Sequence, residues 1–103
     1  MTEWMTFVKS ENARKAEEMI RADFDLAAKQ SITVRDAAVI GVSEAGKGSF
    51  FYITGSDEGV QKCKDIIKEL VVKDVKQQVL DKAKAKIKEE QDAAAAGFGG
   101  IFG

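Results

Sequence analysis

The strongest structural signal in the chain is Ser49-Phe50-Phe51-Tyr52-Ile53-Thr54-Gly55-Ser56, followed by a helical pattern over residues 57–71. Residues 50–54 are all aromatic or β-branched, which are the types that suit a packed strand. Gly55 permits a tight turn, and Ser56 is placed to cap the first free amides of a helix. The predicted helix has an apolar stripe made of Val60, Cys63, Ile67 and Leu70, widened by Ile66 and Val71.

The predicted strand is bulky on both of its faces. Phe50 and Tyr52 alternate with Phe51 and Ile53, so neither face is polar. A strand of this kind is typical of the centre of a sheet that is covered on both sides. The core on one side of it is expected to contain Ile20, Ile53, Val60 and Ile67.

The N-terminal residues predict a strand and then a helix. Over residues 4–9 the side chains alternate, with Met5 and Phe7 on one face and Trp4, Thr6 and Val8 on the other. Ser10 is the expected N-cap of the helix. The apolar stripe of that helix is Ala13, Ala16, Ile20 and Phe24.

The end of this first helix has two interpretations. Asp is a weak helix former and a good cap, so Asp23 predicts a break near Ala22, followed by a second short helix through residues 26–28. A single helix that ends at Lys29 is the alternative.

In residues 31–43 the apolar residues recur at every second position, as in a strand. The even-numbered apolar positions are Ile32, Val34, Ala38, Ile40 and Val42. Asp36 is polar and falls in the same alternating series, so we expect the strand to bend or to start again there. Residues 44–48 are rich in glycine and predict a hairpin loop that leads into the strand of residues 49–54.

The C-terminal part predicts a further helix in the segment 73–96, from about Val75 to Ala96. Its apolar stripe is Val75, Val79, Leu80, Ala83 and Ile87, and the rest is rich in Lys, Gln and Glu. This stripe is expected to pack on the chain's own sheet or on a second copy, because a lone helix of mixed charge is marginal in water. Residues 97–103 are interpreted as a flexible tail, because glycines separate Phe98, Ile101 and Phe102.

Together these elements predict an α+β fold. Residues 1–72 form the core domain, in the order strand, helix or two helices, strand, strand, helix. The sheet is three-stranded and mostly antiparallel, with the strand of residues 49–54 at its centre. The long C-terminal helix is added to this core.

Composition limits the function. The chain has 103 residues, a net charge of −1, one cysteine and no histidine. Without histidine, the commonest general base and the commonest zinc ligand are both missing. The single cysteine excludes an internal disulfide. We expect no catalytic residues, no metal, no cofactor and no membrane contact, and a cytoplasmic location.

Residues 4–71 resemble a KH domain. The resemblance rests on the element order and on residues 49–56 followed by Val60, Cys63 and Ile67. It implies binding of single-stranded nucleic acid by a G-x-x-G loop between the first two helices. The corresponding place here, residues 21–24, holds no glycine and contains Asp23. A ferredoxin-like or ACT-like module that lacks its final strand fits the same order.

Several residues could be interpreted as functional sites, but a structural role accounts for each of them. Gly46-Lys47-Gly48-Ser49 enters a strand and not a helix, so we predict a turn and not a phosphate loop. Cys63 lies on an apolar stripe and predicts a core residue. Three aspartates, Asp23, Asp25 and Asp36, are expected to be caps or solvated loop residues. The lysines at positions 73, 76, 82, 84, 86 and 88 alternate with acids, which is typical of a solvated helix face.

These observations favour a small non-enzymatic module that interacts with another protein or with itself as a homodimer. The predicted interaction surface comprises Phe50, Tyr52, Val75, Val79, Leu80, Ile87, Phe98 and Phe102. A KH-like binder of single-stranded nucleic acid is the alternative function. An enzyme that uses carboxylate or lysine chemistry is the third.

Overall fold

The computed structural model describes the backbone of residues 1–102 and the side chains of residues 1–93. Its elements, in chain order, are strand β1 (Thr2–Lys9), helix α1 (Ser10–Arg21), the 3-10 turn η1 (Ala27–Lys29), strand β2 (Ser31–Asp36), strand β3 (Gly48–Gly55), helix α2 (Asp57–Ile67) and helix α3 (Gln77–Phe102). The predicted α+β fold with a long C-terminal helix is confirmed.

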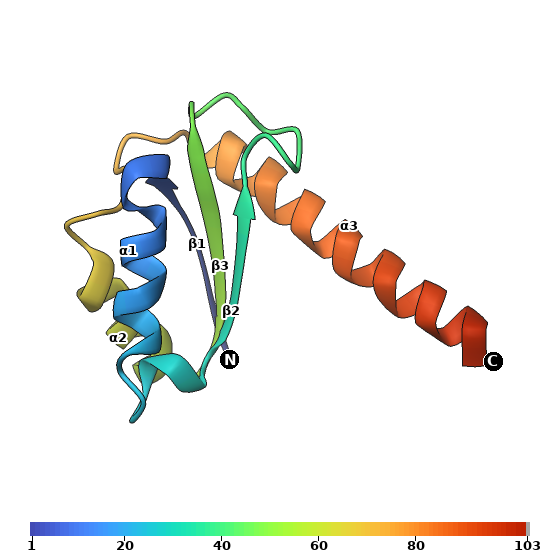
Figure 1. Cartoon of the computed structure of the whole chain (residues 1–103), viewed down its shortest axis with the longest axis horizontal. Coiled ribbons are helices and arrows are strands. Elements are labelled where there is room, and N and C mark those ends of the chain that lie inside the picture. The colour runs from blue at the N-terminus through green and yellow to red at the C-terminus, as the bar shows by residue number, and fades with distance from the viewer. Residues whose placement is uncertain (103) are drawn as a thin grey trace.

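The sheet has three antiparallel strands in the order β1-β3-β2. Ile53 of β3 lies opposite Trp4 of β1 and Ile32 of β2. The strand predicted to be central is therefore central. Helices α1 and α2 cover one face of the sheet, and α3 crosses the other face and continues past β2 (Figure 1).

The face under α1 and α2 holds the first core. Phe51 and Ile53 of β3 are fully buried there. The core also brings together Ile20 of α1 with Val60 and Ile67 of α2, as predicted. Its buried members are Val8, Ala16, Ile20, Ala27, Phe51, Ile53, Val60, Cys63 and Ile67.

The face under α3 holds a second core. The rings of Phe7 and Phe50 lie with their centroids 4.9 Å apart and inclined by 56°. The apolar stripe of α3 therefore packs on the chain's own sheet, which is one of the two predicted alternatives. The buried members of this core are Phe7, Ala37, Ile40, Val42, Phe50, Tyr52, Ala83 and Ile87.

The predicted break after the first helix is confirmed, and the single helix to Lys29 is wrong. Helix α1 ends at Arg21, and the Asp23 carboxylate accepts a hydrogen bond from the Ala27 amide, 3.0 Å from it. Because the helix ends before it, Phe24 leaves the apolar stripe and is 76% exposed. The placement of Phe24 on the apolar stripe of the first helix was wrong.

The predicted caps have different outcomes. Ser56 does cap α2, because its hydroxyl accepts from the Gly59 amide at 3.0 Å. Ser10 does not cap α1: it is the first residue of the helix, and Lys9 at the cap position makes no side-chain cap bond. The reason is that β1 passes directly into α1, so no loop residue is left for capping.

The period of two over residues 31–43 does not describe one strand. Strand β2 ends at Asp36, whose carboxylate accepts from the Ala38 amide at 2.9 Å and turns the chain. Residues 37–41 form turns, with Gly41 at φ 72°. Ile32 and Val34 consequently pack on the first core, whereas Ile40 and Val42 are buried in the second.

The last two helices also differ from the predicted bounds. Helix α2 ends at Ile67, and the chain then makes an isolated bridge from Val71 to Val8 at the outer edge of β1. Helix α3 begins at Gln77 and its backbone remains helical to Phe102, beyond the predicted end at Ala96. A glycine costs only about 1 kcal/mol relative to alanine in a helix, so an existing helix can continue through several of them. The side chains of Phe98 and Phe102 lie outside the described residues.

Candidate interaction surfaces

The predicted interaction residues are used within the chain as far as the structure describes them. Phe50 and Ile87 are fully buried, and Tyr52 is 7% exposed. The remaining members pack against them while half-buried, namely Val75, Val79 and Leu80. Both faces of β3 are therefore covered in a single copy of the chain.

A polar cluster fastens α3 to β1. The Tyr52 hydroxyl donates to a Glu3 carboxylate oxygen at 2.6 Å, and the Lys84 ammonium donates to the other oxygen at 2.5 Å. Lys88 lies 3.6 Å from Glu3. The bonds from Lys84 and Tyr52 lower the pKa of Glu3 to about 2, and burial with the Glu3 bond raises the pKa of Tyr52 to about 12. Glu3 is thus ionised and Tyr52 is protonated near neutral pH.

Further polar contacts fasten α3 along its course over the sheet. Lys82 pairs with Glu44 of the β2–β3 connection at 3.0 Å. At the β2 edge, Arg35 pairs with Glu90 at 3.0 Å, and the Gln91 amide donates to the Thr33 hydroxyl at 3.3 Å. Three of the lysines in the basic run, at positions 82, 84 and 88, are therefore paired with carboxylates of the same chain.

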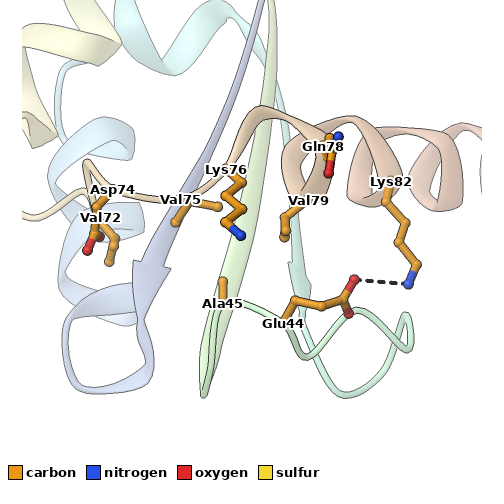
Figure 2. Close-up of a pocket in the computed structure, with 9 residues that line it drawn as sticks. All are labelled: Glu44, Ala45, Val72, Asp74, Val75, Lys76, Gln78, Val79 and Lys82. Atoms are coloured by element: carbon orange, nitrogen blue, oxygen red, sulfur yellow. Dashed lines mark hydrogen bonds and ion pairs between the residues drawn. The ribbon is translucent and has the colours of Figure 1, made fainter.

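A hollow of about 580 Å³ lies between the start of α3 and the β2–β3 connection. Lys76 and Val79 point from the α3 side toward Ala45, and the Glu44–Lys82 ion pair lies to one side (Figure 2). Its lining residues are Glu44, Ala45, Val72, Asp74, Val75, Lys76, Gln78, Val79 and Lys82. Two acids and two lysines balance in charge, so the hollow indicates no class of ligand.

The glycine-lysine-glycine segment is part of a turn, as predicted. Gly46 has φ 97°, a conformation that side chains rarely adopt, and Gly48 begins β3. A Cβ atom at Gly48 would clash with the carbonyl oxygen of Val8 and the ring of Phe7. Close packing against β1 therefore accounts for this glycine without a phosphate.

The remaining chemical candidates have structural roles. Cys63 is fully buried, and burial, followed by the nearby Asp23 charge, raises the pKa of its thiol. Asp23 and Asp36 accept backbone hydrogen bonds in the turns that follow α1 and β2. In the part of the chain that the structure describes, no three acidic or sulfur side chains gather as a metal would require.

Sequence reasoning missed the exposure of Phe24. This side chain lies on the loop between α1 and η1, beside Asp23 and Asp25. An aromatic residue between two aspartates fits a loop better than a helix stripe, because Asp favours turns and caps. That local signal was present in the sequence.

No family model, curated protein or solved structure matches this chain. Among the residues that the structure describes, no helix combines the length and apolar character that a bilayer span requires.

Proposed function

We propose that this chain is a non-enzymatic interaction module that associates with itself or with another protein through the C-terminal end of α3. We define the α3 extension as residues 93–102. It follows Gln91, which makes the last described polar contact of α3 with the sheet.

The observation that carries the proposal is the length of α3 relative to the sheet that it covers. Figure 1 shows α3 running past β2 and away from the rest of the chain. Ten further residues of helix span about 15 Å. The extension has the sequence AAAAGFGGIF, which contains no charged residue. An isolated helical segment of this length is marginal in water, which favours a partner for it.

The rest of the molecule supports a binding role over catalysis. The ionised Glu3 is held by Tyr52 and Lys84 in the contacts between α3 and the sheet. Cys63 is enclosed in the first core. With no histidine in the chain, a general base would have to be a carboxylate or lysine. We therefore propose no reaction and no cofactor.

Sedimentation velocity over a series of protein concentrations tests self-association. We expect the weight-average sedimentation coefficient of the full chain to rise with concentration, and that of a chain truncated after Asp92 to stay constant. The truncated chain should keep its thermal midpoint, because Ala83 and Ile87 precede the cut. The variant Phe24→Ser, which changes a 76% exposed phenylalanine on the loop after α1, is a control that should sediment like the full chain.

If the full chain is monomeric at every concentration, it does not associate with itself. The proposal then requires that the immobilised full chain binds a defined partner protein and that the truncated chain does not. If both experiments are negative, the interaction proposal is wrong.

Single-stranded nucleic acid binding is the second candidate, because the element order and the β1-β3-β2 sheet agree with the KH resemblance. We expect it to be weaker than about 1 μM at physiological salt, the range of non-specific phosphate contacts. The loop that would hold a phosphate carries Asp23 and Asp25 and no glycine. Titration of labelled RNA and DNA at two salt concentrations tests this, and a nanomolar, salt-sensitive complex would make nucleic acid the primary ligand.

A further inference from the structure

A further hollow lies beside α3, between this helix and the turns that follow β2. It measures about 330 Å³, and its lining residues are Val39, Ile40, Lys86, Glu89, Glu90 and Ala93. We call it the Val39 hollow. Ala93 is also the first residue of the α3 extension, so the hollow adjoins the segment to which we assign the interaction.

The apolar wall of the Val39 hollow is exposed but held in place. The Val39 side chain is 73% exposed. Its amide donates to the Asp36 carbonyl at 3.1 Å, and the Ile40 amide donates to the same carbonyl at 3.3 Å. Ile40 itself is buried in the second core. A side chain on an anchored turn loses little conformational freedom when it binds, which favours a docking role.

The charges around the Val39 hollow balance. Glu90 pairs with Arg35 at 3.0 Å. Lys86 and Glu89 then add one charge of each sign. The other lining residues are apolar, so the hollow fits a segment that carries no charge. Nucleic acid would instead require an excess of positive charge.

The α3 extension of the same copy cannot fill this hollow. Helix α3 is continuous over Gln77–Phe102 and leads away from the sheet (Figure 1). Each residue after Ala93 lies about 1.5 Å further along the helix axis, away from the stretch 86–93 that lines the hollow. Because filling it from the same copy would require the helix to reverse, the occupant has to come from another molecule.

We propose that the Val39 hollow of each copy receives the α3 extension of a second copy. This inference rests on the proposed function and names its partner as a second copy of the chain. The extension, AAAAGFGGIF, carries no charge, as the hollow requires. In an antiparallel pair of α3 helices that cross near Ala93, residues 94–102 of each copy lie beside residues 86–93 of the other. A two-fold axis at the crossing therefore fills both hollows with one self-complementary contact.

Disulfide cross-linking between differently labelled copies tests the pairing directly. One chain carries Val39→Cys, and the other carries cysteine at Ala94, Ala95 or Ala96, three positions that point in different directions around a helix. We expect at least one of the three mixtures to form a disulfide between the two chains, identified by mass spectrometry. The natural Cys63 is fully buried and should stay reduced. Phe24→Cys, on the loop after α1, is the matched exposed control and should not cross-link to the extension.

A charge placed in the Val39 hollow should oppose the same contact. Val39→Asp should weaken self-association at least about tenfold in sedimentation velocity, because the contact would bury a carboxylate without a partner. Phe24→Asp puts the same charge at a site of nearly equal exposure and should sediment like the full chain. Both variants change exposed side chains, so circular dichroism should show the parent fold.

The results separate this inference from the proposed function. Suppose that the full chain self-associates and that truncation after Asp92 abolishes this, while no cysteine of the extension cross-links to Val39→Cys and Val39→Asp has no effect. The extension then binds elsewhere on the second copy, which overturns the inference and leaves the proposed function in place. A full chain that is monomeric at every concentration would also overturn the inference, and the proposed function would then depend on a different protein partner.

Discussion

The two faces of the sheet are covered in different ways. On the first face, α1 and α2 bury an apolar core around Phe51 and Ile53. On the second face, α3 buries Phe50 and Tyr52, and polar contacts with Glu3 also hold it. On the first face both helices lie over the sheet, whereas the helix on the second face continues past it (Figure 1). This difference is the basis of our proposal that the first part of α3 closes the core and that its C-terminal part binds a partner.

Removal of α3, which covers the second face of the sheet, should have the largest effect on stability. A chain that ends at Lys73 lacks α3 and leaves Phe7, Phe50 and Tyr52 uncovered. Burial of each large apolar side chain contributes about 1.5–3 kcal/mol, so the loss approaches the total stability of about 5–15 kcal/mol. We expect aggregation and binding of a hydrophobic dye, measured by light scattering and dye fluorescence. A stable, monomeric truncated chain that binds no dye would show that α3 does not belong to the core.

Truncation of one isoleucine on each face sharpens the comparison. Ile67→Ala should cost about 2–5 kcal/mol, because Ile67 is fully buried in the first core and leaves a cavity. Ile87→Ala should cost less, about 2 kcal/mol, because a single helix closes the second core and can shift toward the sheet to reduce the cavity. Urea unfolding measures both values. A larger loss for Ile87→Ala than for Ile67→Ala would reverse the proposed ranking of the two cores.

The polar contacts of the second cover predict a smaller effect that depends on pH. Folding lowers the pKa of Glu3 to about 2, so its contribution to stability is present above about pH 4.5 and declines as the pH falls toward 2. Folding raises the pKa of Tyr52 to about 12, so its contribution is present below pH 10 and is lost as the pH rises toward 12.

The variant Glu3→Gln should remove the acidic part of this dependence. Urea midpoints of the parent and variant chains should converge between pH 4.5 and pH 2. The Glu3 side chain is 42% exposed, so solvent and salt screen the effect and keep it small. A constant difference between the two chains over this range would mean that the Glu3 contacts do not form in solution.

The sequence predicted the centre of the fold better than its connections. Residues 50–54 have bulky side chains on both faces of the strand. This pattern correctly predicted that β3 lies between two strands and that both of its faces are covered. The spacing of Val60, Cys63 and Ile67 correctly oriented α2. These patterns are reliable because burial on a regular element repeats at a fixed period.

The breaks near Asp23 and Asp36 were predicted, but the apolar patterns were continued past them, where local hydrogen bonds turn the chain. Asp36 turns the chain at Ala38, so the apolar period of two continues into turns that bury Ile40 on the opposite face. Helix α1 ends at Arg21 and Asp23 accepts from the Ala27 amide in the following turn, so Phe24 no longer follows the helical stripe. The described members of the predicted interaction surface are covered by the chain itself, and periodicity alone does not say which copy supplies that cover.

Hydrogen–deuterium exchange along α3 tests the division of this helix most directly. The amides of residues 79–91 should be protected at every protein concentration, because the chain's own sheet holds them. The amides of residues 93–102 should gain protection only as the concentration rises or a partner is added. Protection that ends before residue 91, or an α3 extension whose exchange never responds to concentration or to partner, would contradict the account.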